Sequence, residues 1–234
     1  MPCRLCLQDK PLRWSHIVPE FMYERIYNPK HQIFAIKGET RIRIQQKGAR
    51  ERLLCFNCEQ QFSRYENYAA PAFFRRTFKD EEQQGRVVIL RGLDYKLLKL
   101  FFLSVLWRFG VTSIDLLKGA MLGPHEERLR QMLINEDSGD ELIYPCTVTE
   151  VSPKGTSLDG WILPPRRSRP HGIWVWNTTL GRFLLGYFVA SHPAPAGVRP
   201  IFLNPAGTMR IYRADIREIP SLIRYAEKLT QVDF

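Results

Sequence analysis

The chain has 234 residues, 44% of them hydrophobic, and its 34 basic and 24 acidic side chains give a formal net charge of +10. This hydrophobic content excludes an intrinsically disordered chain, and the length allows one compact body with a small appended module. The positive charge is concentrated in residues 1–80, which carry 15 basic and 8 acidic groups. A basic excess of this size favours a polyanionic partner, most often nucleic acid.

Short elements are expected in the first third of the chain. HIVPEFMYERIY (16–27) predicts a short helix, because Pro19 suits a first helical position. The stretch 32–46 alternates apolar and polar residues around a KGET turn, which predicts a hairpin. A helix is expected to follow Cys55 and Cys58, and Pro71 should end or bend that helix.

The middle of the chain predicts two helices. The stretch from Leu93 to about Gly110 is apolar on nearly all sides, which predicts a helix buried in the centre of the fold. Lys99 and Arg108 interrupt it, and its apolar core is about half of the roughly 20 residues that a membrane span needs. GPHEERLRQMLI (123–134) predicts the second helix.

From residue 141 the pattern changes to β-structure. Short aromatic or β-branched runs, separated by turn residues, predict strands at 142–151, 172–179, 182–190, 199–204 and 208–214. The Arg- and Pro-rich stretch 163–172 is expected to be a loop, and 218–229 a final helix. We therefore expect an α+β fold with a helical middle and a C-terminal antiparallel sheet closed by a helix.

Two cysteine pairs are the strongest signal in the sequence. Cys3 and Cys6 form one CxxC turn, and Cys55 and Cys58 form another. Two such turns present four thiolates to one ion, the ligand set of a structural zinc site. Four incidental cysteines in a reduced compartment are the alternative. A first pair on a turn and a second pair opening a helix is the layout of a treble-clef zinc finger, whereas the fifth cysteine, Cys146, is expected to be a small buried hydrophobe.

These features divide the chain into three regions. We expect a zinc-stapled module in residues 1–80, a helical core region in residues 81–140, and a β-rich region with a terminal helix in residues 141–234. A CxxC pair stands where a secretory signal would have its charged and apolar segments, so we expect a cytoplasmic protein without a membrane partner.

The segments CRLC, WSHIVPEF and LLCFNCEQQFSRYE together resemble the zinc-bearing branch of the HNH, or ββα-metal, nucleases. That family joins a CxxC pair, a His-Ile-x-Pro motif and a second CxxC pair followed by a helix. The resemblance covers about residues 3–68, under a third of the chain. The chain beyond the finger, with LDYKLLKLFFLSVLWRFG, resembles that of uncharacterised bacterial proteins carrying this finger, which implies one integrated fold and no chemistry.

The resemblance implies catalytic roles for three residues. His16 falls on the general base that activates water against a phosphodiester, a role that suits a neutral imidazole. Glu66 falls on the helix where some family members place an acidic residue, and Glu59 falls where Asn is usual. The two glutamates are two helical turns apart and share one face, so we expect them to hold a catalytic Mg²⁺ or Mn²⁺ ion.

Two positions depart from the family pattern. Ser15 stands where the family has an acidic or histidine ligand, and a hydroxyl is a poor ligand for Mg²⁺; Arg50 stands where Asn is expected. We favour a metal-dependent endonuclease that acts on nucleic acid, with DNA as the expected substrate. The alternatives are a catalytically degenerate zinc finger that binds nucleic acid and a protein–protein adaptor with a protein partner. A structural role for His16, bonding a backbone carbonyl, also stays open.

Basic residues are expected to line the route into the second cysteine pair. Beside a groove that contains His16 they would neutralise phosphates, giving salt-dependent contacts that are largely independent of sequence. An ordinary solvated strand face is the alternative. The residues concerned are Arg41, Arg43, Lys47, Arg50 and Arg52.

Overall fold

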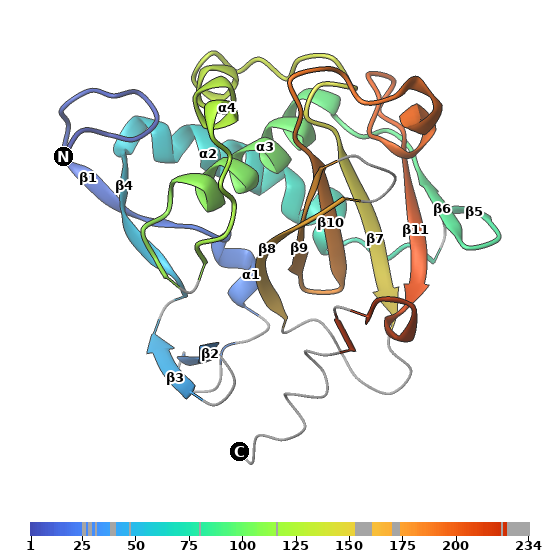
Figure 1. Ribbon diagram of the computed structural model, residues 1–234, viewed down its shortest axis with the longest axis horizontal. Coiled ribbons are helices and arrows are strands. Elements are labelled where there is room, and N and C mark those ends of the chain that lie inside the picture. Colours follow the sequence, from blue (N-terminus) through green and yellow to red (C-terminus); the bar gives the residue numbers. More distant parts are fainter. Residues whose placement is uncertain are drawn as a thin grey trace.

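The computed structural model describes residues 1–24, 27, 30, 32–37, 41–46, 48–79, 81–115, 117–152, 161–169, 174–220 and 222–223, with the backbone alone at 32–37, 41–46, 152 and 196. Helices and strands mix along the chain, which confirms the expected α+β class. Figure 1 shows the N-terminal strands at one side and a large sheet at the other.

Two strand pairs lie in the N-terminal part. Strand β1 (Leu12–His16) pairs antiparallel with β4 (Arg50–Cys55), and β2 (Gln32–Lys37) pairs with β3 (Arg41–Gln46) in the hairpin predicted from the alternating pattern. The helix expected over 16–27 is only one turn in the described residues, α1 (Glu20–Tyr23), and Pro19 lies at its N-cap.

A long helix begins inside the second cysteine pair. It is α2 (Phe56–Ala69), and it continues directly into a π-helical turn, η1 (Ala70–Phe74). Pro71 has no backbone N–H to donate, so the regular α-helical pattern cannot continue through it. The predicted break at this proline is confirmed.

The two central helices are found as expected. Helix α3 (Tyr95–Val111) starts at Asp94, whose carboxylate accepts a hydrogen bond from the Leu97 backbone N–H at 2.9 Å. Helix α4 (Pro124–Ile134) packs beside it. Almost every side chain of α3 from Leu98 to Phe109 is buried. No helix in the described part of the chain is both long and apolar enough to cross a membrane.

Seven strands form the large sheet, in the order β5-β6-β11-β7-β10-β9-β8. All neighbouring strands are antiparallel except β11 and β7, which run parallel. The sheet is therefore mixed, whereas an entirely antiparallel sheet was expected. Their bounds are β5 Glu82–Gln84, β6 Val87–Leu90, β7 Cys146–Ser152, β8 Ile162–Ser168, β9 Val175–Leu180, β10 Phe183–Phe188 and β11 Met209–Asp215.

Three local expectations differ from the structure. Strands β5 and β6 lie in the region expected to be helical, and they complete one edge of the sheet. The expected loop 163–172 contains strand β8; its two prolines are tolerated because β8 is the other edge strand. The strand expected at 199–204 is largely a 3₁₀ helix, η3 (Ala196–Ile201), with Pro200 inside it. A short 3₁₀ turn, η4 (Ile216–Glu218), follows β11. Residues 220, 222 and 223 are helical, and the rest of the expected final helix lies outside the described residues.

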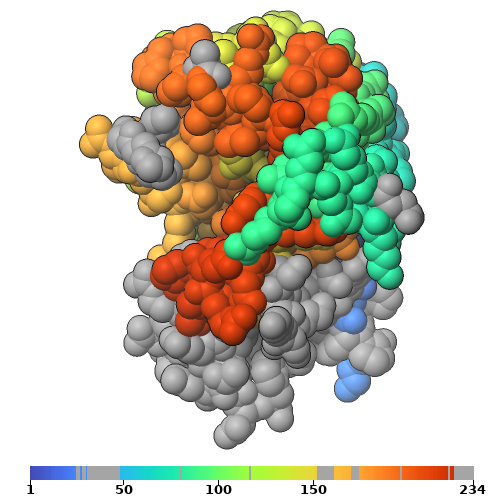
Figure 2. Space-filling view, turned by 90° about the vertical axis from the view of Figure 1, so that its right-hand side faces the viewer, coloured from blue at the N-terminus to red at the C-terminus, as the bar shows by residue number. Residues whose placement is uncertain are grey.

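One hydrophobic core runs through all three expected regions. It includes Leu53 of β4, Leu106 of α3 and Leu185 of β10, and the boundaries expected at residues 80 and 140 do not interrupt it. In Figure 1, α3 lies between the β1–β4 pair and the large sheet. Figure 2 turns the right-hand side of Figure 1 toward the viewer, where β5 and β6, in green, lie beside the orange to red residues around β11.

Candidate metal centre and the adjoining histidine site

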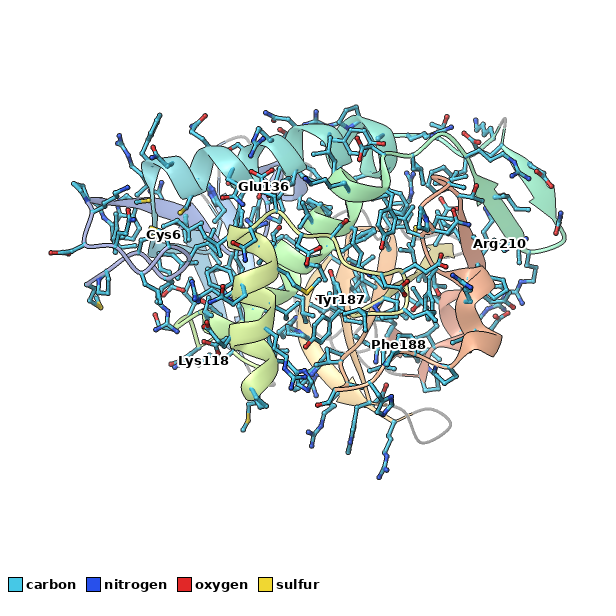
Figure 3. All side chains as sticks on the ribbon, turned by 90° about the horizontal axis from the view of Figure 1, so that it is seen from above. Cys6, Lys118, Glu136, Tyr187, Phe188 and Arg210 are labelled. Atoms are coloured by element: carbon cyan, nitrogen blue, oxygen red, sulfur yellow. The ribbon has the colours of Figure 1, made fainter. Side chains whose placement is uncertain are left out.

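The four predicted zinc ligands lie together at one end of the molecule, and Cys6 marks their place in Figure 3. Their sulfur atoms all lie within 4.8 Å of one another. A tetrahedral zinc ion with Zn–S bonds of about 2.3 Å holds its ligands about 3.8 Å apart. The Cys6 and Cys55 sulfur atoms are separated by 3.8 Å. The predicted four-cysteine cluster is therefore confirmed, with a size that fits a metal ion such as zinc.

Three adjoining elements supply these thiols. Cys3 and Cys6 lie on the N-terminal turn, Cys55 ends β4, and Cys58 lies in the first turn of α2. The Cys55 backbone N–H donates to the Cys3 sulfur at 3.3 Å, which locks the turn onto the strand. A hydrogen bond from Cys58 lowers the pKa of Cys3 to about 4, and the same contact raises the pKa of Cys58. A divalent cation would take the place of the protons that these crowded thiols share.

Helix α4 fixes the first cysteine turn from the outside. Arg130 donates to the Leu5 carbonyl oxygen at 2.6 Å and pairs with Glu127 at 2.7 Å. The spacing in this helix favours Glu126 as the partner of Arg130, whereas the structure pairs Arg130 with Glu127. The bond from Arg130 to Leu5 joins residues 125 positions apart, and no sequence pattern predicts it. The turn that carries two of the four thiols is therefore held by a helix from the middle of the chain.

His16 ends strand β1 beside a buried serine. Ser15 is 1% exposed and accepts a hydrogen bond from the Leu54 backbone N–H at 3.1 Å. The His16 ring lies 2.5 Å from the Glu20 carboxylate through Nε2, and its side chain is 24% exposed. The carboxylate partner, Glu20, was not predicted. A spacing of four residues indicates a side-chain pair only within a helix, and His16 ends a strand.

The two predicted glutamates of α2 lie near His16. Burial raises the pKa of Glu59, and the negative charge of Glu66 adds to this rise. A hydrogen bond from Ser15 and the charges of Arg108 and His16 lower the same pKa, but they do not cancel the effect of burial. Glu59 Oε1 is buried without a hydrogen-bond partner among the described residues. The structure thus brings His16, Glu59 and Glu66 into one neighbourhood.

Arg108 is the residue at the centre of this neighbourhood, although in the sequence it is only an interruption of an apolar helix. Its side chain is 4% exposed and donates to Glu66 at 2.7 Å and to the His16 carbonyl oxygen at 2.9 Å. It also donates to the backbone and side chain of Ser104. An arginine in an apolar helix is rarely buried unless it is paired, and that was the signal available in the sequence.

These contacts bear on the expected Mg²⁺ or Mn²⁺ site. Among the described residues, only the four cysteines bring three or more ligand atoms together. Glu66 is engaged by Arg108, and the Ser15 hydroxyl accepts from Leu54. The described side chains therefore do not assemble a second metal site for a hard divalent ion.

The side chains of two of the five predicted phosphate-binding residues are described, and they lie opposite β1. Arg50 pairs in register with His16, and Arg52 with Trp14. The two guanidinium groups lie 5.5 and 5.0 Å from the centre of the Trp14 ring. Arg41 and Arg43 belong to β3, but their side chains, like the whole of Lys47, lie outside the described residues.

Comparison of this chain with models of protein families, with curated proteins and with solved structures gives no match.

Proposed function

We propose that this protein is an HNH-like endonuclease with a structural zinc ion, in which His16 is the general base. The observation that carries the proposal is the pair formed by His16 and Glu20 at a partly exposed strand end beside the cysteine cluster. A carboxylate at one ring nitrogen fixes the tautomer and the orientation of an imidazole, as in other histidine-assisted hydrolases.

The proposed reaction is hydrolysis of a phosphodiester. His16 would take a proton from water as the water oxygen bonds to phosphorus. The bond from phosphorus to one ester oxygen would break, and that oxygen would take up a proton from solvent and leave as an alcohol. Arg50, the in-register neighbour of His16, would neutralise the phosphate. The described carboxylates are not assembled as ligands for Mg²⁺ or Mn²⁺, so the proposed roles are those of protein side chains alone.

The structural part of the proposal is a treble-clef zinc finger. Its support is the layout: a cysteine turn, the β1–β4 strand pair, and a helix whose first turn carries Cys58. Four sulfur ligands favour zinc over hard cations, and five free thiols favour a reducing compartment, which we take to be the cytoplasm.

A second candidate function is favoured by one observation. Glu66 is neutralised by Arg108 and Ser15 is buried, so the positions where the family holds its divalent ion have other partners here. This arrangement favours a zinc finger that binds nucleic acid without cutting it.

Nicking of supercoiled plasmid DNA, and cleavage of RNA, with and without divalent ions, separates these functions. We expect His16→Ala to slow cleavage by about 10²–10⁴-fold, the usual contribution of a positioned general base. Zinc content and nucleic-acid affinity should be retained. His192→Ala, which removes an exposed histidine elsewhere, is the matched control. Undiminished cleavage by His16→Ala would refute the role of His16, and a wild-type protein that binds without cutting would decide for the second function.

A further inference from the structure

Two large aromatic rings are exposed beside the cysteine cluster. Trp14 of β1 and Phe56 at the start of α2 are each 53% exposed. Arg50 and Arg52 lie over the Trp14 ring, and Arg13 lies 5.5 Å from the centre of the Phe56 ring. We call Trp14, Arg50 and Arg52 the Trp14 surface.

Strand geometry places the Trp14 surface next to the proposed catalytic base. Side chains alternate between the two sides of a strand, so Trp14 and His16 share one side and the buried Ser15 points to the other. Their in-register partners on β4, Arg52 and Arg50, face them. Residues two apart on a strand are about 7 Å apart, so a base stacked on Trp14 would bring its phosphate near His16.

The Trp14 surface is positively charged. Among the described residues, no carboxylate lies within ion-pair distance of Arg13, Arg50 or Arg52. A comparable stack elsewhere differs in this respect: Arg86 lies 5.0 Å from the Tyr212 ring centre and is paired with Glu218 at 2.8 Å. Arg52 donates a hydrogen bond to the Leu12 carbonyl oxygen, which leaves its charge without a counter-ion among the described residues. Guanidinium groups that lack a carboxylate partner around an open ring complement a ligand that is both anionic and flat.

We infer that the Trp14 surface binds single-stranded nucleic acid, with one base stacked on Trp14 and the flanking phosphates held by Arg50 and Arg52. In a duplex the faces of the bases are covered by their neighbours, whereas an unpaired base offers its face to an aromatic ring or a guanidinium plane. This inference rests on the proposed function for its nucleic-acid ligand, and it does not require cleavage. It assigns unpaired strands as the substrate class.

Fluorescence anisotropy with a labelled single-stranded oligonucleotide, as DNA and as RNA, and with the duplex of the same sequence tests the inference. Trp14→Ala should weaken single-strand binding by about 5- to 150-fold, the range for the loss of one stacked base, and Trp14→Phe by less. Tyr212→Ala, which removes the ion-paired stack, should bind as the wild type does. Unchanged zinc content and circular dichroism would show that Trp14→Ala is folded.

The outcomes separate this inference from the proposed function. If single-strand binding depends on Trp14 and no cleavage is detected, the binding role of the Trp14 surface is supported and the proposed nuclease activity is refuted. If the protein cleaves or tightly binds only the duplex, and Trp14→Ala does not change this, the binding role of the Trp14 surface is refuted and the proposed nuclease activity is not. A protein that binds no nucleic acid at low salt, but binds polyglutamate through Trp14, overturns both in favour of an acidic protein partner.

Discussion

Replacing Arg108 with methionine should destabilise the whole protein, because this side chain joins three elements. From α3 it donates to Glu66 on α2 and to the His16 carbonyl at the end of β1. Methionine retains much of the apolar volume and removes the charge and every donor. The Glu66 carboxylate, 20% exposed, would then be left without its cation in a largely apolar setting.

The size of the effect follows from burial. Removing one partner of a buried ion pair usually costs about 3–5 kcal/mol, because the remaining charge is stranded. Since Glu66 keeps some contact with solvent, we expect the lower end, about 3 kcal/mol. In a chain of this length that corresponds to a fall in melting temperature of about 6–12 °C.

Urea denaturation, followed by circular dichroism, measures this change. Arg64→Met is the matched control, since Arg64 pairs with Glu136 at the surface with 58% of its side chain exposed, and such pairs contribute about 0–1 kcal/mol. Combining Arg108→Met with Glu66→Leu should recover part of the loss, because no charge is then stranded. A loss of less than about 1 kcal/mol in Arg108→Met, equal to that in the control, would refute the central role of Arg108.

Two further predictions concern the metal centre and the buried carboxyl. The purified protein should carry about one zinc ion per chain, and Cys55→Ser should lose this ion with a large drop in stability, whereas Cys146→Ser should keep it. Metal analysis and thermal denaturation measure the two effects. A Cys55→Ser protein that is free of zinc but as stable as the wild type would contradict the site. Burial raises the pKa of Glu59, so its folded state holds the proton more tightly than the unfolded state and the unfolding free energy should fall as pH rises from about 4.5 toward neutral. Glu59→Gln should remove this fall in the unfolding free energy and should be more stable than the wild type at neutral pH. If the unfolding free energies of the two proteins depend on pH in the same way, the fold does not favour the protonated form of Glu59.

Local sequence signals predicted the elements that local physics decides. The alternation at 32–46 predicted the β2–β3 hairpin, because the hairpin depends on neighbours along the chain. The four-cysteine cluster joins two distant pairs, but each pair carries its own local CxxC signal, and the shared metal chemistry of the two pairs predicted that they meet. The apolar stretch after Leu93 predicted α3 for the same reason.

What sequence patterns missed are contacts between distant residues. The bond from Arg108 to His16 spans 92 positions, and no periodicity records it. Strands β5 and β6 are too short to show a period, and they are strands because β11 pairs with β6. The site followed the same rule: the cysteines and His16 have motifs, whereas Arg108, Glu20 and Arg130 acquire their roles from the fold alone.

The place of β11 in the large sheet has a consequence for how the chain is completed during synthesis. This strand, near the end of the chain, lies between β6 and β7. Until residues 209–215 have left the ribosome, the β5–β6 hairpin and the β7-β10-β9-β8 group have no strand between them. Both would present unpaired edges to other nascent chains, where edge-to-edge pairing leads to aggregation. A cut or stop codon between η3 and β11 should therefore divide the sheet in two, while leaving every residue of the cysteine cluster in place.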